Sequence, residues 1–311
     1  MAHIERHPQV ADYFVQFSLA EIEARGGVAD LVETGNIVIL KDYRLDVDFE
    51  VLTRLRKSTE GIEDRQLKKT LKKLESPFFF EGEPPVERKG RLLFANDVRQ
   101  AVFDVICRGD RELFDAAAKA LQHSHDEALR IFGAAFPSYE PFRLVPSVRL
   151  TRTLFENLHW DNHSIDDDFH QARVFANLDV RPRIWHVSHR VPEMMRRLYR
   201  EHDLGRFAGR DPNELLDYLN GDVLGGGHKI WMDNQPRHRI AWEPGEVWLG
   251  ESRLISHQIY YGEAAMVYMW FMRSKSMADP QNRFNAIVED VHREMAEGAA
   301  ADAPEAAPAA A

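Results

Sequence analysis

Hydrophobic residues recur at helical spacing over much of the first half of the chain. This spacing predicts helices over residues 3–26, 49–75 and 97–132. The last of these is expected to end near Gly133, with Pro137 just beyond it. A short β-branched run, Ile37–Leu40, follows a Gly-Asn turn signal and predicts the first strand. About residues 1–146 are therefore expected to be mainly helical.

The pattern changes after Pro146 to short apolar runs separated by Gly, Pro and Asp. The runs are SVRLTRTLF, ARVFANLDV, RIWHVSH, HRIAWEP, EVWLGESRLISHQIYY and AAMVYMWFM. Closely spaced strands of this kind predict a β-sandwich or open barrel over about residues 147–275. A helical pattern at 192–220 interrupts the strands and reads as an insertion. We expect one domain over residues 1–296 and a disordered Ala/Pro-rich tail over 297–311.

Composition and charge narrow the classes of function. The net charge of −10 argues against a general nucleic-acid binder, whose affinity rests on neutralising phosphates. Cys107 is the only cysteine, so any metal must be bound by His, Asp or Glu. The polar start MAHIERHPQV lacks the apolar core of a secretory signal, and no stretch is long enough to cross a bilayer. These features predict a cytoplasmic protein.

One basic segment, RQLKKTLKKL at residues 65–74, stands out from this acidic background. Its leucines are spaced for a helix with a basic face. A solvated helix face is the simpler interpretation, and peripheral contact with an anionic lipid or substrate is the alternative. The oligomeric state is not indicated by any pattern.

The segment LHWDNH carries the main candidate site. Alternation along an extended chain puts His159 and Asp161 on one face and turns Trp160 away. A third ligand has to come from a distant strand, and His257 in RLISHQIYYG lies on such a strand. Two imidazoles and one carboxylate on one side of Fe(II) leave three positions, two for a chelating 2-oxo acid and one for dioxygen. The set predicts an Fe(II)- and 2-oxoglutarate-dependent oxygenase, with ascorbate as an optional further cofactor.

Two other interpretations of these histidines remain open. His159 and Asp161 would also suit an ordinary imidazole–carboxylate hydrogen bond, with His257 as a satisfied core histidine. Competing imidazoles are His163, His170, His186 and His189. The acidic run SIDDDF lacks the alternation and the glycine of a calcium loop, which favours a solvated loop.

At these residues the sequence resembles the Kdo hydroxylase family, Fe(II)- and 2-oxoglutarate-dependent dioxygenases that act on the 3-deoxy-manno-octulosonic acid sugar of lipopolysaccharide. The resemblance is carried by LHWD, ARVFANLDVRPRIWHV and PGEVWLGESRLISHQIYYGEAAM, and extends from about Asn36 to Met272. It implies an α+β fold built on a double-stranded β-helix, a jelly-roll or cupin-like barrel with flanking and inserted helices. It also implies His159, Asp161 and His257 as iron ligands. The stretch RTLFENLHWDNHSIDDD departs from the family pattern, so the resemblance carries the metal ligands better than the substrate contacts.

The distal carboxylate of 2-oxoglutarate needs a cation. In many relatives of this barrel an arginine follows the last iron histidine, but GEAAMVYMW contains none, and Arg273 comes only sixteen positions after His257. Arg173 and Arg183 are the alternatives, each of which would otherwise be a strand-edge charge in water. Asn177 and Trp185 are expected to line the same pocket.

The predicted function is hydroxylation of a small polar substrate, with an acidic sugar such as Kdo, free or lipid-linked, as the first candidate. A free amino acid or a natural-product intermediate is a second substrate class. A non-catalytic, cupin-like protein that binds a metal or a sugar is the alternative of another class.

Overall fold

A large curled sheet forms the centre of the computed structural model, which describes residues 2–71, 73–74, 86–88, 91–93, 95–162, 168–226 and 234–301. Its strands follow the order β1-β11-β10-β13-β9-β12-β3-β2. They are β1 (His3–Glu5), β2 (Phe14–Phe17), β3 (Ile37–Leu40), β9 (His170–Asn177), β10 (Arg183–Arg190), β11 (His238–Trp242), β12 (Val247–Gly250) and β13 (Ile255–Met272). Further strands are β7 (Pro141–Val145) and β8 (Val148–Leu154), which pair with β13, β4 (Lys73–Leu74), which pairs with β8, and the hairpin of β5 (Val86–Arg88) and β6 (Arg91–Leu93).

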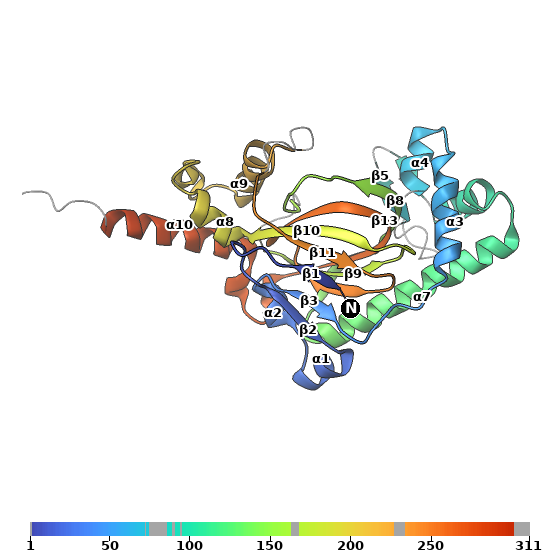
Figure 1. Ribbon diagram of the computed structural model, residues 1–311, viewed down its shortest axis with the longest axis horizontal. Helices are drawn as coiled ribbons and strands as arrows, with labels where there is room; N and C mark the ends of the chain where they lie inside the picture. The colour runs from blue at the N-terminus through green and yellow to red at the C-terminus, as the bar shows by residue number, and fades with distance from the viewer. Residues whose placement is uncertain are drawn as a thin grey trace, which may run out of the picture.

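Helices cover the sheet in two groups (Figure 1). The first group comprises α1 (Leu19–Arg25), α2 (Ala29–Glu33), α3 (Phe49–Glu60), α4 (Arg65–Leu71), α6 (Ala95–Ala101), the π-helical turn η1 (Val102–Ile106) and the long α7 (Arg111–Ala135). The second comprises α8 (Val191–Leu198), η2 (Leu204–Phe207), α9 (Pro212–Tyr218), η3 (Leu219–Val223) and α10 (Phe284–Ala301), with the short turns η6 (Ser274–Ser276) and η7 (Pro280–Asn282) before α10. The second group gathers at the opposite end of the sheet from α3 and α4.

Strand alternation explains why the sheet is buried on both faces. On β9, Val174 and its neighbours two residues away face the core formed with the first group of helices. Phe175 faces the other way, into an apolar cluster that also contains Trp248 and the second group of helices. Every residue of β9 is buried as a result. Aromatic rings stack within the second cluster, such as Trp242 on Trp248 at a centroid distance of 4.1 Å.

The jelly-roll prediction is confirmed, but the N-terminal helix was predicted too long. Residues 3–26 form two strands before α1, because β1 pairs with β11 and β2 pairs in parallel with β3. Tertiary pairing overrides the helical spacing there. Ile37–Leu40 is a strand as predicted, although it is the third along the chain. The part of the chain before residue 146 thus contributes strands as well as helices to the fold.

Three other predicted helices differ in their boundaries. The first, over 49–75, ends at Gly61 and resumes as α4. The second, predicted over 97–132, is broken by Arg108 and Gly109, both at positive φ, before Asp110 caps α7. The insertion at 192–220 divides into α8, η2, α9 and η3, with Asp203 at positive φ in the first break. At the other end of the chain α10 runs to Ala301, into the tail that was predicted to be disordered, and residues 302–311 lie outside the described ranges.

The basic segment at 65–74 forms α4 and β4, with Leu71 and Leu74 fully buried. Within the described ranges, no helix combines the length and the apolar composition that are needed to cross a bilayer.

Candidate metal centre

The backbone places the two candidate histidines directly opposite each other. His159 lies in the segment that follows β8, and His257 lies on β13. The N–H of His159 donates to the carbonyl of His257 at 3.0 Å, and the N–H of His257 donates back at 2.8 Å. This isolated antiparallel bridge brings the two rings to a centroid distance of 4.6 Å. Residues almost a hundred positions apart thus present their imidazoles on the same side.

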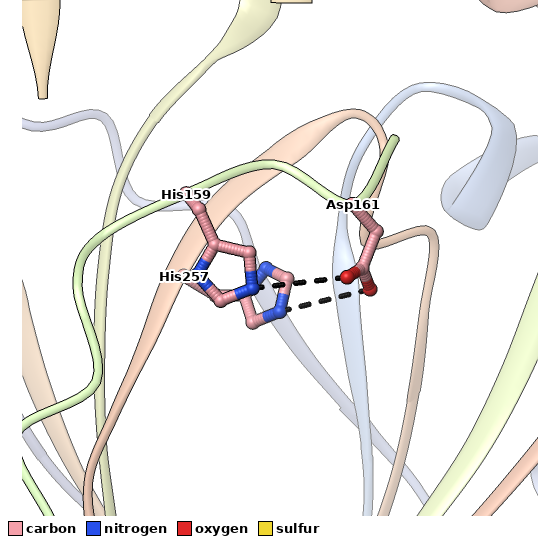
Figure 2. A group of neighbouring side chains, drawn as sticks. All are labelled: His159, Asp161 and His257. Atoms are coloured by element: carbon pink, nitrogen blue, oxygen red, sulfur yellow. Dashed lines mark ion pairs between the residues drawn. The ribbon is translucent and has the colours of Figure 1, made fainter. Parts of the chain in front are cut away.

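Asp161 completes the group from the same segment as His159 (Figure 2). Its N–H donates to the carbonyl of Ser252 at 3.1 Å, which fixes the backbone near the start of β13. Oδ1 of Asp161 lies 3.7 Å from Nε2 of His159, and Oδ2 lies 3.8 Å from Nε2 of His257. One ligand atom from each residue lies within 4.8 Å of the others, and this is the one such group found in the described part of the chain.

These separations fit an ion between the side chains better than direct hydrogen bonds. Hydrogen bonds of this type are about 2.7–3.2 Å long, shorter than the observed distances. Metal bonds of about 2.1 Å at right angles put neighbouring ligand atoms about 3 Å apart, so a bound ion would draw together the three ligand atoms that lie within 4.8 Å of one another. The geometry therefore favours the metal interpretation over a simple imidazole–carboxylate pair.

The other ring nitrogens fix the tautomer of both histidines. Nδ1 of His159 lies 2.8 Å from the carbonyl oxygen of Asn157, and Nδ1 of His257 lies 3.1 Å from that of Ile255. A carbonyl can only accept, so each Nδ1 carries the proton and donates it. The lone pair of each neutral ring is then on Nε2, which faces Asp161, and this is the arrangement found around metal ligands.

Burial and neighbouring charges shift the pKa of all three groups. Burial, with a smaller contribution from His159, lowers the pKa of His257 to about 3, so this ring is neutral at neutral pH. Burial opposes the charge on Asp161, but Arg173 and the two histidines outweigh it and hold the pKa of this carboxyl well below its usual range. Burial likewise opposes charge on His159, but Asp161 prevails and raises the pKa of His159.

A cavity of about 120 Å³ opens beside the three ligand atoms. Its polar lining includes Arg149, Glu156, Arg173 and Arg183. Its apolar wall consists of Phe175, Trp185, Trp248, Ile259, Ala265 and Val267. An apolar lining with a few convergent charged groups is typical of a small-molecule site.

Of the four residues predicted to bind the co-substrate, two line the cavity and two do not. Arg173 and Arg183 line the cavity. Nη1 of Arg173 lies 2.5 Å from Oδ2 of Asp161, so this arginine is engaged with a candidate ligand. Asn177 does not line the cavity, because its amide donates to the carbonyls of Arg181 and Trp242 at the end of β9.

Arg273 is also outside the cavity lining. It donates to the carbonyl of Asp168 and lies over the ring of Phe142 beyond the end of β13. Trp185 lines the cavity as predicted. Arg149 and Glu156 were missed, since no motif distinguishes them from other charges near a strand end.

None of the competing histidines that the structure describes joins the group. Nδ1 of His170 is 3.2 Å from Oε2 of the buried Glu251. His186 contacts the amide oxygen of Gln258, and His189 contacts Arg197. His163 and most of the acidic run SIDDDF, residues 164–167, lie outside the described ranges.

Comparison with known proteins gives a fold but no close relative. No protein-family model matches the chain, and no curated protein sequence is a significant match. Among solved structures, the Kdo hydroxylase KdoO in complex with 2-oxoglutarate and Fe(III) is 15% identical, with a TM-score of 0.59 over 90% of this chain and 96% of that one. The chain has the KdoO fold. The succinate and Fe(III) complex gives a TM-score of 0.57 at 14% identity, and the apo structure 0.54 at 15%, over the same shares of the two chains.

Proposed function

We propose that this protein is an Fe(II)- and 2-oxoglutarate-dependent oxygenase that hydroxylates a polar substrate. One observation carries the proposal: His159, Asp161 and His257 converge from two segments with their ligand atoms within 4.8 Å, on one side of a cavity. Two imidazoles and a carboxylate arranged in this way are the donor set of the non-haem iron oxygenases. The likeness to the KdoO fold agrees with this donor set.

Different residues of the site would hold the metal and enclose the reactants. His159, Asp161 and His257, which line the cavity, would hold iron beside it. Bound iron, 2-oxoglutarate and dioxygen together supply the oxidant that hydroxylates a substrate C–H bond while 2-oxoglutarate becomes succinate and carbon dioxide. The aromatic wall that contains Phe175, Trp185 and Trp248 limits the water around the reacting groups.

Arg183 is our candidate for the cation that binds the distal carboxylate of 2-oxoglutarate. Its side chain is buried, lines the cavity, and its Nε has no hydrogen-bond partner among the described residues. Burial lowers the pKa of Arg183 to about 10, so the guanidinium stays charged at neutral pH. A buried cation of this kind is stabilised when it meets an anion.

Gly262 on β13 makes room for this guanidinium. A Cβ at position 262 would lie 2.8 Å from Cζ of Arg183 and closer still to Nη1. Arg173 is a weaker candidate for the same role, because its Nη2 donates to Oε1 of Gln171 at 3.3 Å while Nη1 faces Asp161. In many relatives the cation is an arginine that follows the last iron histidine. Here it would come instead from the start of β10.

For the substrate we propose the Kdo sugar of lipopolysaccharide, free or lipid-linked. The fold likeness to an enzyme described as a Kdo hydroxylase supports this choice. Arg149 adds a third arginine to the cavity and Glu156 adds an acceptor, a combination that suits an acidic sugar with hydroxyl groups. An amino acid would satisfy the same charges, so it is the substrate class to compare.

The test is succinate formation by the iron-loaded protein with Kdo-lipid A, free Kdo and a panel of amino acids. We expect Kdo-containing compounds to give the largest stimulation over the uncoupled background. His257→Ala should abolish turnover, and His123→Ala, at an exposed position of α7, should retain it. Stimulation by an amino acid alone would replace the Kdo assignment. Failure of every preparation to bind iron would remove the oxygenase assignment itself.

A further inference from the structure

The backbone of Trp160, between the two candidate ligands His159 and Asp161, is held by a single side chain of the helical insertion. Oδ1 of Asn220 accepts from the N–H of Trp160 at 3.0 Å, and Nδ2 of Asn220 donates to the carbonyl of Trp160 at 2.9 Å. A carboxamide bonded to both backbone groups of one residue replaces the pair of hydrogen bonds that a neighbouring strand would make. It satisfies the N–H and the carbonyl of Trp160, which belong to the two consecutive peptide groups flanking this residue, and limits the rotation of both.

Neighbouring residues tie the same segment to the same insertion. Nδ2 of Asn162 donates to the carbonyl of Asn213 at 3.2 Å and to Oδ1 of Asp217 at 2.7 Å. Nδ2 of Asn157 donates to the carbonyl of Leu224 at 3.3 Å. The ligand-bearing segment is thus fixed by β13 and the turn before it on one side, and by α9, η3 and the residue after them on the other.

The indole of Trp160 explains how these contacts set the direction of the ligands. Trp160 is 1% exposed and belongs to the apolar cluster that contains Leu216 and Leu219 of the insertion. Because alternate residues of an extended segment face opposite sides, burial of Trp160 in this cluster turns His159 and Asp161 toward the cavity. The amide of Asn220 then holds the backbone of Trp160 at the centre of this arrangement.

We infer that Asn220 is a positioning residue of the metal centre, and that the insertion is part of the structure that builds this centre. The inference rests on the proposed function insofar as His159 and Asp161 are metal ligands. The Asn220 amide bonds to the backbone of Trp160, and Asn220 is not among the described residues that line the cavity. It acts through the backbone N–H and carbonyl of Trp160, and the orientation of the two peptide groups on either side of this residue determines where the imidazole of His159 and the carboxylate of Asp161 point.

The test is the affinity of Asn220→Ala for Co(II) alone and for Fe(II) under anaerobic conditions. Loss of a residue that orients metal ligands typically weakens metal binding about 10- to 100-fold, and we expect a change in this range. The visible spectrum of bound Co(II) should also change, because its bands report the geometry of the ligands. Asn36→Ala is the matched control, since Asn36 is a half-buried asparagine that also donates to a backbone carbonyl, that of Leu31, on another part of the sheet.

A second variant keeps the test decisive if the alanine variant does not fold. Asn220→Asp retains the shape and can still accept from the N–H of Trp160, but a carboxylate cannot donate to the carbonyl. We expect an affinity below that of the wild type together with a changed Co(II) spectrum. Wild-type affinity and spectrum in folded Asn220 variants would overturn the inference while leaving the oxygenase proposal intact. A wild-type protein that binds neither metal would instead overturn the proposed function and this inference with it.

Discussion

Arg173 offers the sharpest test of how the charges of the site depend on one another. Its side chain is 5% exposed and its Nη1 lies 2.5 Å from Oδ2 of Asp161, whose side chain is 23% exposed. Arg173→Met keeps an apolar stem of similar length but leaves the carboxylate without its cation. Removal of one partner from a buried ion pair costs about 3–5 kcal/mol. Because Asp161 is partly exposed, we expect the lower end, about 3 kcal/mol of unfolding free energy in the metal-free protein.

The assay is urea unfolding in the presence of a chelator, for the wild type, Arg173→Met and Arg196→Met. Arg196 pairs with Glu294 on the surface, with side chains 45% and 54% exposed, so its loss should cost at most about 1 kcal/mol. Adding Asp161→Asn to Arg173→Met should recover much of the loss, because no unpaired charge remains. If Arg173→Met costs no more than Arg196→Met, the reasoning about this buried pair is refuted.

Three further predictions concern the cavity and the core beside it. Arg183→Met should weaken 2-oxoglutarate binding by roughly 10- to 100-fold, the value of a charge-assisted hydrogen bond, while Fe(II) affinity measured by titration stays the same. Gly262→Ala should displace the Arg183 guanidinium and have the same selective effect, so an unchanged dissociation constant for 2-oxoglutarate would exclude Arg183 as its anchor. Glu251→Gln tests the pH dependence of stability: burial raises the pKa of Glu251 from 4.5 to about 7, so the native wild type keeps a proton that the unfolded chain loses as the pH rises through this window. The wild type should therefore lose about 3 kcal/mol relative to Glu251→Gln between these pH values, and a difference that does not vary with pH in urea unfolding would contradict the assignment.

The sequence predicts features whose signal is local. Alternation in LHWDNH placed His159 and Asp161 on one face, and the structure has them so because Trp160 is buried on the other. The apolar runs after residue 146 became strands of the jelly roll, since each run has the length and the β-branched or aromatic content that a buried strand requires.

The remaining features depend on register and on distant partners. Arg183 reaches the cavity because the start of β10 lies beside β13 near Gly262, and spacing along the chain does not reveal which strands are neighbours. The same limit explains why Asn177 and Arg273 were assigned to a pocket that they do not line. Asn220 left no signal, since an asparagine in a helical insertion resembles any solvated residue until its backbone partner is known. The strand at His3–Glu5 was hidden for a similar reason, because its pairing partner β11 lies more than two hundred residues away.

The most direct test of the central claim is an anaerobic titration of the protein with Fe(II) and 2-oxoglutarate, followed in the visible spectrum. A 2-oxo acid that chelates iron held by two histidines and one carboxylate gives a weak charge-transfer band. We predict this band at one equivalent per chain in the wild type and in His123→Ala, and its absence in His257→Ala. Absence of the band in the wild type, or full iron and 2-oxoglutarate binding by His257→Ala, would contradict the assignment of His159, Asp161 and His257 as the iron site.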